Sequence, residues 1–167
     1  MSSTNSSANS ISDQASQASE NEPLISGLHH VNIQVPPQTL HIASQFYAGT
    51  LGLTQTPAPD SMKAHLAWFD MGSSGQQIHI TSQFHLDQAQ MKAQSESPRH
   101  LCFKILSEDK LDQLQERIWQ LYKTGGESAP VHCDDPAQTA SGRIGPKGFP
   151  KRFFARDYAG NRLEFSL

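Results

Sequence analysis

The chain of 167 residues carries 13 Lys and Arg, 16 Asp and Glu, and a formal net charge of −3, so it has no basic excess of the kind that nucleic acids attract. No apolar run approaches the length of a bilayer span, and we expect no membrane association. The two cysteines, Cys102 and Cys133, make neither a disulfide framework nor a CxxC metal knuckle. These features favour a globular protein of the cytoplasm, which is a reducing compartment.

The N-terminal 26 residues are rich in Ser, Asn and Gln and contain no Lys or Arg. Such a segment has too little apolar surface to offset the entropy of ordering, so we predict a disordered tail over residues 1–26. A lack of basic residues is untypical of secretory and mitochondrial leaders. Asp13, Glu20 and Glu22 account for the net charge, which leaves residues 27–167 near neutral.

The first predicted strand is GLHHVNIQVP, residues 27–36, in which two adjacent histidines precede alternating apolar residues. Alternate side chains of a strand point to opposite faces. Every second residue from Val31 to Val35 is apolar, so His29 lies on the apolar face and His30 on the polar one. We expect a structural role for His29 and a chemical role for His30.

The order of one strand, one helix and three strands occurs twice along the chain. The first predicted helix stops at Gly52, and the second begins at Ser107 as N-cap and stops at Gly125. The segments RHLCFKI, QQIHI and NRLEFSL repeat the alternation of the first strand, each with one metal-capable side chain opposite an apolar face. The four residues placed in this way are His30, His79, His100 and Glu164.

This repeat predicts an α+β fold of two βαβββ modules, residues 27–82 and 98–167, with a polar linker over residues 83–97. The apolar faces must meet the helices, so the polar faces are left to line a shared concavity that suits a small-molecule substrate. Three imidazoles and one carboxylate there suit a divalent metal ion: Zn, Fe, Ni, Co or Mn. The alternative from the residues alone is a metal-free binding cup.

Each module ends in a predicted hairpin, and the segments WFDMGSSGQQIHI and FFARDYAGNRLEF align without a gap. A five-residue loop, DYAGN, would pair Phe154 with Glu164, and the repeat would place Phe69 beside His79. Two arginines of the same strand would share the inward face and hold an anionic substrate group, or would lie at the rim and face water. The predicted substrate-binding residues are Phe69, Phe154, Arg152 and Arg156.

The segments GLHHVNIQV, FYAGTLGL, RHLCFKI and RFFARDYAGNRLEF together resemble the vicinal oxygen chelate superfamily, which includes glyoxalase I, extradiol dioxygenases, and the fosfomycin- and bleomycin-resistance proteins. The resemblance covers residues 27–167. It implies a cup-shaped mixed sheet with the helices on its outer face and a divalent metal ion inside. The ligands that it implies are His30, His79, His100 and Glu164.

The activity that the resemblance implies is that of a metal-dependent isomerase or lyase of the glyoxalase type. The ion would polarise vicinal oxygens of a small substrate, and Glu164 would be the catalytic residue that moves a proton. Glyoxalase I, however, has a glutamate at the position of His79. Extradiol dioxygenases bind Fe(II) with two His and one Glu, but their acid/base histidine is replaced by Gln76 and Gln77.

Three classes of function therefore remain: a glyoxalase-like enzyme, an Fe(II) extradiol-type dioxygenase, and a non-catalytic protein that sequesters a small molecule. The sequence leaves open the substrate, the metal and the use of glutathione. It also leaves open whether the two modules close around the site within one chain or across a homodimer.

Overall fold

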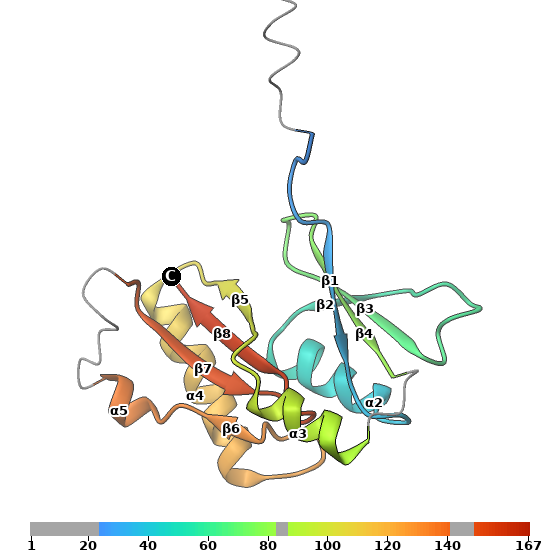
Figure 1. Ribbon diagram of the computed structural model, residues 1–167. Helices are drawn as coiled ribbons and strands as arrows, with labels where there is room; N and C mark the ends of the chain where they lie inside the picture. The colour runs from blue at the N-terminus through green and yellow to red at the C-terminus, as the bar shows by residue number, and fades with distance from the viewer. Residues whose placement is uncertain (1–23, 83–86, 141–148) are drawn as a thin grey trace, which may run out of the picture.

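The computed structural model describes residues 24–82, 87–140 and 149–167, which form two sheets with their helices (Figure 1). The predicted tail lies outside the described residues as far as residue 23. The elements of the first module are β1 (His30–Gln34), α2 (Leu40–Ala43), η1 (Ser44–Thr50), β2 (Thr54–Thr56), β3 (Leu66–Asp70) and β4 (Gln77–Thr81). Helix α3 (Gln88–Glu96) follows, and the second module consists of β5 (Leu101–Lys104), α4 (Glu108–Thr124), β6 (His132–Cys133), α5 (Pro136–Ala140), β7 (Arg152–Arg156) and β8 (Arg162–Ser166).

Each module forms a four-stranded mixed sheet with the same order of strands. The first sheet has the order β1-β4-β3-β2 and the second has the order β5-β8-β7-β6. The first and last strands of a module are parallel, and the other neighbours are antiparallel. Strands β1 and β5 are therefore edges of their sheets in the described part of the chain. The predicted α+β fold of two βαβββ modules is confirmed.

Helix α4 begins and ends where the sequence predicts. The Ser107 side chain accepts a hydrogen bond from the backbone N–H of Lys110 (3.3 Å), and Gly125 follows the last turn with a φ of 78° that glycine adopts without strain. Leu111 and Ile118 are buried against the second sheet. No helix in the described ranges combines the length and apolarity that a membrane crossing requires.

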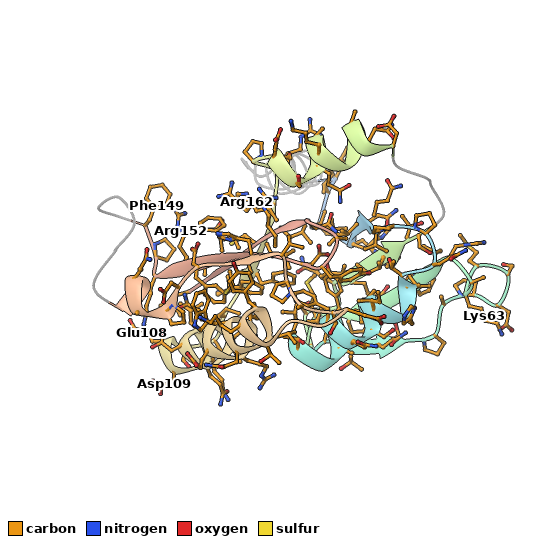
Figure 2. The ribbon with its side chains drawn as sticks, turned by 90° about the horizontal axis from the view of Figure 1, so that it is seen from below. Lys63, Glu108, Asp109, Phe149, Arg152 and Arg162 are labelled. Carbon is orange, nitrogen blue, oxygen red and sulfur yellow. The ribbon has the colours of Figure 1, made fainter. Side chains whose placement is uncertain are left out.

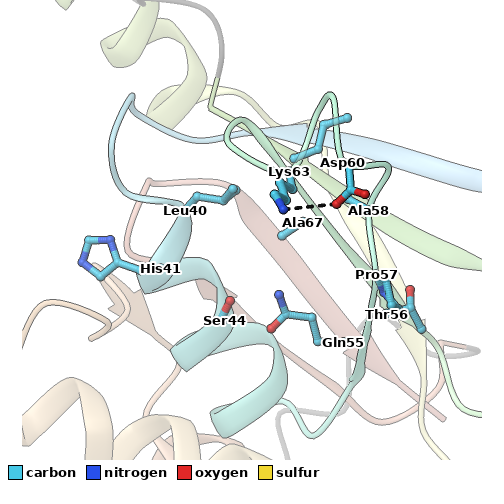
Figure 3. A pocket seen from close by; sticks show the side chains of 11 residues that line it. Leu40, His41, Ser44, Gln55, Thr56, Pro57, Ala58, Asp60, Lys63 and Ala67 are labelled. Carbon is cyan, nitrogen blue, oxygen red and sulfur yellow. Dashed lines mark hydrogen bonds and ion pairs between the residues drawn. The ribbon is translucent and has the colours of Figure 1, made fainter.

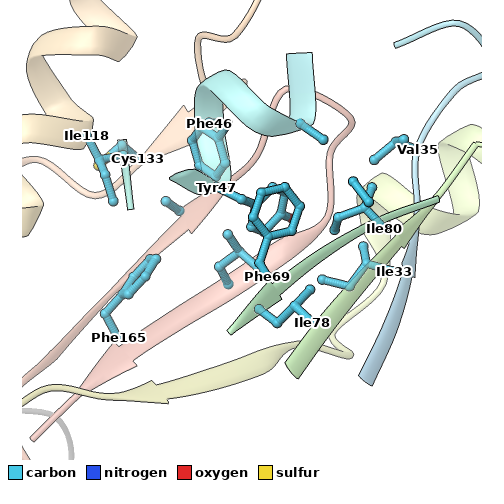
Figure 4. Close-up of a cluster of buried hydrophobic side chains, with 14 of the residues drawn as sticks. Ile33, Val35, Phe46, Tyr47, Phe69, Ile78, Ile80, Ile118, Cys133 and Phe165 are labelled. Carbon is cyan, nitrogen blue, oxygen red and sulfur yellow. The ribbon is translucent and has the colours of Figure 1, made fainter. Parts of the chain in front are cut away.

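The first helical segment changes from α to π geometry at η1 and ends before Gly52, whose φ is +77°. Phe46 and Tyr47 point from η1 into the core and are fully buried there (Figure 4). Their rings meet edge to face at 5.3 Å, and the Tyr47 ring also contacts Phe69 of β3 at 5.7 Å. This packing fixes the helix on the apolar face of the first sheet, as the alternation along the strands predicts.

The predicted linker contains helix α3, which the sequence reading did not foresee. Asp87 and Gln90 form a capping box: the Asp87 carboxylate accepts from the Gln90 N–H (2.8 Å), and the Gln90 side chain accepts from the Asp87 N–H (2.9 Å). Helix α3 lies on the face of the sheets opposite α4 (Figure 2). Gln94 donates to the backbone oxygen of Gln34 and to the side chain of Asn161, so α3 bridges both modules.

The loop between β7 and β8, residues 157–161, fastens the second module to the first. Tyr47 Oη donates to Asp157 Oδ2 at 2.7 Å, and Asn161 Nδ2 donates to the same oxygen at 2.9 Å and to the backbone oxygen of Gln34 at 3.1 Å. Burial raises the pKa of the Asp157 carboxyl group, and the hydrogen bonds that it accepts oppose this rise. Helix η1 and the loop 157–161, far apart in the sequence, thus meet where the two modules join, and we call this contact region the seam.

The gapless alignment of the two hairpins is wrong by one residue. Strands β3 and β4 pair Asp70 with Gln77 and leave a six-residue loop, whereas β7 and β8 pair Arg156 with Arg162 and leave the predicted five-residue loop. An added loop residue shifts the register by one, and a shift by one exchanges the two faces of a strand. The face of Phe69 is therefore the opposite of the predicted one.

Candidate metal and substrate site

The first half-site lies on the polar face of the first sheet. The His30 and His79 rings are stacked with centroids 4.2 Å apart, and Trp68 stacks on the other side of His79 at 4.6 Å. Gln77 uses its side-chain N–H to donate to Asp70 (2.7 Å), which leaves its oxygen to accept from His79 Nε2–H (3.0 Å). His79 Nδ1 then carries the free lone pair, which a metal ligand requires.

The pKa of His79 is lowered, first by burial and then by the neighbouring imidazoles of His30 and His29. Both causes favour the neutral ring, the form that binds a metal ion. His29 is exposed and shares a hydrogen bond with His30 between their Nδ1 atoms (3.0 Å). The prediction placed His29 on the helix-facing side as a structural residue. In the structure His29 is not buried under the helix and contacts His30 instead.

The second half-site lies at the equivalent place of the second sheet. His100 Nδ1–H donates to the backbone oxygen of Pro98 (2.8 Å), which aims Nε2 at Glu164 Oε2 at 2.7 Å. Arg152 donates to the other carboxylate oxygen, Oε1, at 3.1 Å. The Glu164 side chain is 8% exposed, so both of its oxygens are engaged in a largely dry environment.

An aromatic side chain stands beside each half-site, as predicted, but one of the two was misidentified. Phe154 pairs with Glu164 across the strands, and its ring meets His100 edge to face at 5.6 Å. Phe69 was predicted to stand beside His79, and this prediction was wrong. Trp68 pairs with His79, while Phe69 is fully buried on the helix-facing side of the sheet.

The two arginines predicted on the inward face are there, and their partners differ. Arg152 binds Glu164 and lies over the Phe154 ring at 5.6 Å. Arg156 donates to the backbone oxygens of Gly160 (2.9 Å) and Ser97 (3.3 Å) at the seam. Both arginines therefore have hydrogen-bond partners within the protein. Arg152 binds the Glu164 carboxylate rather than an anionic substrate group.

The four predicted metal ligands form two pairs within one chain, not one cluster. His30 is with His79, and His100 is with Glu164. Across the described ranges, no three His, Cys, Asp or Glu side chains are placed so that they could hold a metal ion together. The donor types fit a divalent metal, and the free Nδ1 of His79 and the oriented Nε2 of His100 suit ligation. The described residues therefore do not form a metal site closed within one chain.

A groove of ≈ 990 Å³ reaches the second half-site at His100. One wall is strand β1 from Val31 to Gln34, and the other includes His100 and Arg162. The end of α3 forms its rim. The groove thus runs along β1 and reaches the head of the second half-site.

A second pocket, of ≈ 360 Å³, lies between α2 and the segment that joins β2 to β3 (Figure 3). It is lined by His41, Ser44 and Gln55 and by the ion pair of Lys63 with Asp60 (3.1 Å). None of the predicted site residues lines it. It is therefore separate from the candidate site.

Neither a protein family model nor a curated protein matches the sequence. Solved structures do match. A glyoxalase family protein from Bacillus anthracis is 27% identical, with a TM-score of 0.59, 86% of this chain and 96% of that chain covered. The fosfomycin resistance protein FosX from Listeria monocytogenes is 18% identical, with a TM-score of 0.60 and coverages of 86% and 91%. The fold is that of the vicinal oxygen chelate superfamily. The resemblance seen in the sequence is thereby confirmed.

A third vicinal oxygen chelate structure, a glyoxalase/dioxygenase from Nostoc punctiforme, is 19% identical, with a TM-score of 0.59 and coverages of 87% and 95%. FosX has been solved with Mn(II) and sulfate, at 19% identity to this chain. These structures share the fold with this chain and carry different activities in their names, so they support an enzyme of this superfamily without choosing the reaction.

Sequence reasoning missed several residues of the site. Trp68 and Gln77 were missed because of the one-residue error in the first hairpin. Trp68 and Phe69 are adjacent aromatic residues on opposite faces of the strand, and either one suits the polar face. Cys102 pairs with Glu164 across β5 and β8, and partial burial together with that carboxylate raises the pKa of its thiol. Arg162 lies at the head of β8 over the Phe154 ring at 4.4 Å. Arg162 lies two residues before Glu164 in a predicted strand, so strand alternation places both on the same face and could have identified Arg162 as a site residue.

Proposed function

We propose that this chain is a metal-dependent enzyme of the glyoxalase-like type that acts on a small substrate through two vicinal oxygens. The observation that carries the proposal is the repeat of one arrangement in both modules. A histidine at the head of the first strand, His30 or His100, contacts the metal-capable residue of the last strand, His79 or Glu164. Structural cores do not require such pairs on a polar face, whereas a metal site built from two modules does.

The residues that would hold the ion are His30, His79, His100 and Glu164, and the ion would supply polarisation of the substrate oxygens. The protein provides orientation through the partners of these ligands. Gln77 fixes the tautomer of His79, and the backbone oxygen of Pro98 fixes that of His100. These contacts fix the orientation of both rings before any ligand arrives.

Glu164 is the residue that we assign to proton transfer. Arg152 holds Oε1 and keeps the carboxylate in one orientation, while Oε2 is the atom that accepts a proton from the substrate and returns it. Phe154 and the low exposure of Glu164 exclude water from one side of this oxygen. Glu164 is the one carboxylate among the four candidate ligands, so a proton shuttle on this site depends on it.

We further propose that the enzyme is a homodimer in which the first half-site of one chain meets the second half-site of its partner. The separation of the two pairs within one chain supports this arrangement, and so do the edge positions of β1 and β5 in the described sheets. Leu24, Ile25 and Leu28 are exposed next to β1 and would be covered by a partner. The free thiols of Cys102 and Cys133 agree with a cytoplasmic location.

The decisive experiment is elemental analysis of protein purified without chelator, compared with His30→Ala and His100→Ala. We expect stoichiometric metal in the wild type and a large loss in both variants, with the fold retained because the core uses the opposite sheet faces. His41→Ala, an exposed histidine of α2, is the matched control and should keep its metal. Iron together with O2 uptake would favour the dioxygenase alternative. Equal metal content in all four proteins would refute the site and favour a sequestration protein.

A further inference from the structure

Arg162 is a cation of the groove without an anionic partner. Its guanidinium lies over the Phe154 ring at 4.4 Å and, in the part of the chain that the structure describes, makes no hydrogen bond or ion pair. Figure 2 shows Arg162 and Arg152 on the face of the sheet opposite Glu108 and Asp109 of α4. An arginine with five donors and no acceptor nearby is able to bind an anionic ligand.

A second cation stands directly across from Arg162. Strands β7 and β8 pair Arg156 with Arg162, and like charges at opposed positions of a sheet destabilise it. Burial lowers the pKa of Arg156, and the charge of Arg162 adds to this effect. Arg156 donates to the backbone oxygens of Gly160 and Ser97, and the neighbouring Asp157 carboxylate opposes only part of this lowering. An anion between the two guanidinium groups would relieve the repulsion.

The other charged groups of the groove do not supply that anion. Glu96 is the acidic residue among those that line it, and its carboxylate faces Lys92 at 3.8 Å. Arg99 adds a further cation at the rim, and His100 is engaged with Glu164. The groove is therefore electropositive at the point where it reaches the second half-site.

We infer that Arg162, with Arg156 across from it, binds an anionic group of the substrate beside His100 and Glu164. The substrate is then a small oxygenated acid, whose carboxylate, phosphonate or phosphate group lies on the arginines while its vicinal oxygens face the half-site. This inference deepens the proposed function and rests on it for the role of the ligand as a substrate. Arg152, which the sequence suggested for this task, holds Glu164 instead.

Calorimetric titration with methylphosphonate tests the subsite in metal-free protein and in protein loaded with Mn(II). We expect saturable binding to the wild type in both states. Arg162→Gln should weaken it by about 10-fold to 100-fold, because charge-assisted bidentate hydrogen bonds are lost. Arg162→Lys should lie between the two, since it keeps the charge and loses the fork. Lys110→Gln removes an exposed cation of α4, the helix whose Glu108 and Asp109 lie on the other side of the sheet from Arg162 (Figure 2); it is the matched control and should change binding less than about twofold.

Absence of saturable binding to the wild type would overturn the inference, as would equal binding by Arg162→Gln or equal weakening by Lys110→Gln. Thermal melts of each variant separate loss of the fold from loss of the subsite. The metal-free arm separates this inference from the proposed function. A chain that binds methylphosphonate through Arg162 but takes up no metal ion retains the anion subsite and loses the metal chemistry.

Discussion

The indole ring of Trp68 lies parallel to the imidazole of His79, with centroids 4.6 Å apart and planes 14° from each other. Its Nε1 atom is buried and has no hydrogen-bond partner among the described residues, and the same is true of Oγ1 of Thr56, which is paired with Trp68 across β2 and β3. Buried polar atoms normally have a partner, so these two are candidates to contact a bound molecule. The stack also makes Trp68 a reporter of the first half-site.

Mn(II) added to metal-free protein should quench tryptophan fluorescence, because a paramagnetic ion held by His79 lies next to the Trp68 ring. The chain has two tryptophans, and Trp119 packs against Tyr122 of α4. Quenching should therefore persist in Trp119→Phe and vanish in Trp68→Phe. The opposite pattern would mean that the ion binds away from the first half-site.

Phe69→Ala should destabilise the protein by about 3–5 kcal/mol, because a fully buried aromatic side chain leaves a cavity in the core. Phe154→Ala should cost less, about 1–2 kcal/mol, since its half-buried ring loses mainly its contacts with His100 and the arginines. Urea unfolding of both variants measures the difference. Equal losses would show that Phe154 belongs to the core and not to the wall of the site.

Tyr47→Phe should reduce the free energy of unfolding by about 1.5–3 kcal/mol, the usual contribution of a hydrogen bond to a charged group. Tyr122→Phe, on the exposed side of α4, is the control and should change stability little. A double-mutant cycle with Asp157→Asn assigns the loss to the seam. Additive effects of the two changes would contradict a direct coupling between the modules.

Mixing two inactive variants should restore metal binding if the site is shared across a dimer. His30→Ala retains an intact second half-site, and Glu164→Gln retains an intact first one. A mixed dimer then has one complete site, whereas sites closed within each chain would remain defective in both. Mn(II) bound after unfolding and refolding the two variants together, relative to each alone, distinguishes the arrangements. No gain on mixing would place both half-sites of a working site in one chain.

One thiol per chain should react with a disulfide reagent at mild alkaline pH. Cys133 is buried and its pKa is raised to about 12, so it stays a thiol, whereas Cys102 is exposed. Burial and, after it, the Glu164 carboxylate raise the pKa of Cys102, so Glu164→Gln should increase its thiolate fraction and speed its reaction. Two fast thiols in the folded protein would contradict the burial of Cys133.

Strand alternation was sufficient to predict which face each metal-capable residue occupies, because burial on one side leaves only one register. His30, His100 and Glu164 lie where the alternation placed them. Loop length is less well determined by sequence, since Trp68 and Phe69 fit a polar-facing or a core position equally well. The error at the first hairpin came from this ambiguity.

No local sequence pattern indicates that the four candidate metal ligands separate into two pairs. The separation depends on how the loop 157–161 docks on η1 and on helix α3, and such docking is determined by contacts between residues far apart in the chain. The capping box at Asp87 and Gln90 was visible in the sequence and could have predicted α3. Where the helix would lie could not be deduced from it.

The seam makes the two modules chemically unequal. In the hairpin of the first module, Met71 stands where the second module has Asp157, each donating its N–H to the residue that closes the loop. A methionine at the position of Asp157 would leave the buried Tyr47 hydroxyl without a carboxylate to accept its hydrogen bond. The two modules are thus complementary at the seam rather than equivalent, because the buried tyrosine of the first module depends on a carboxylate that only the second module supplies.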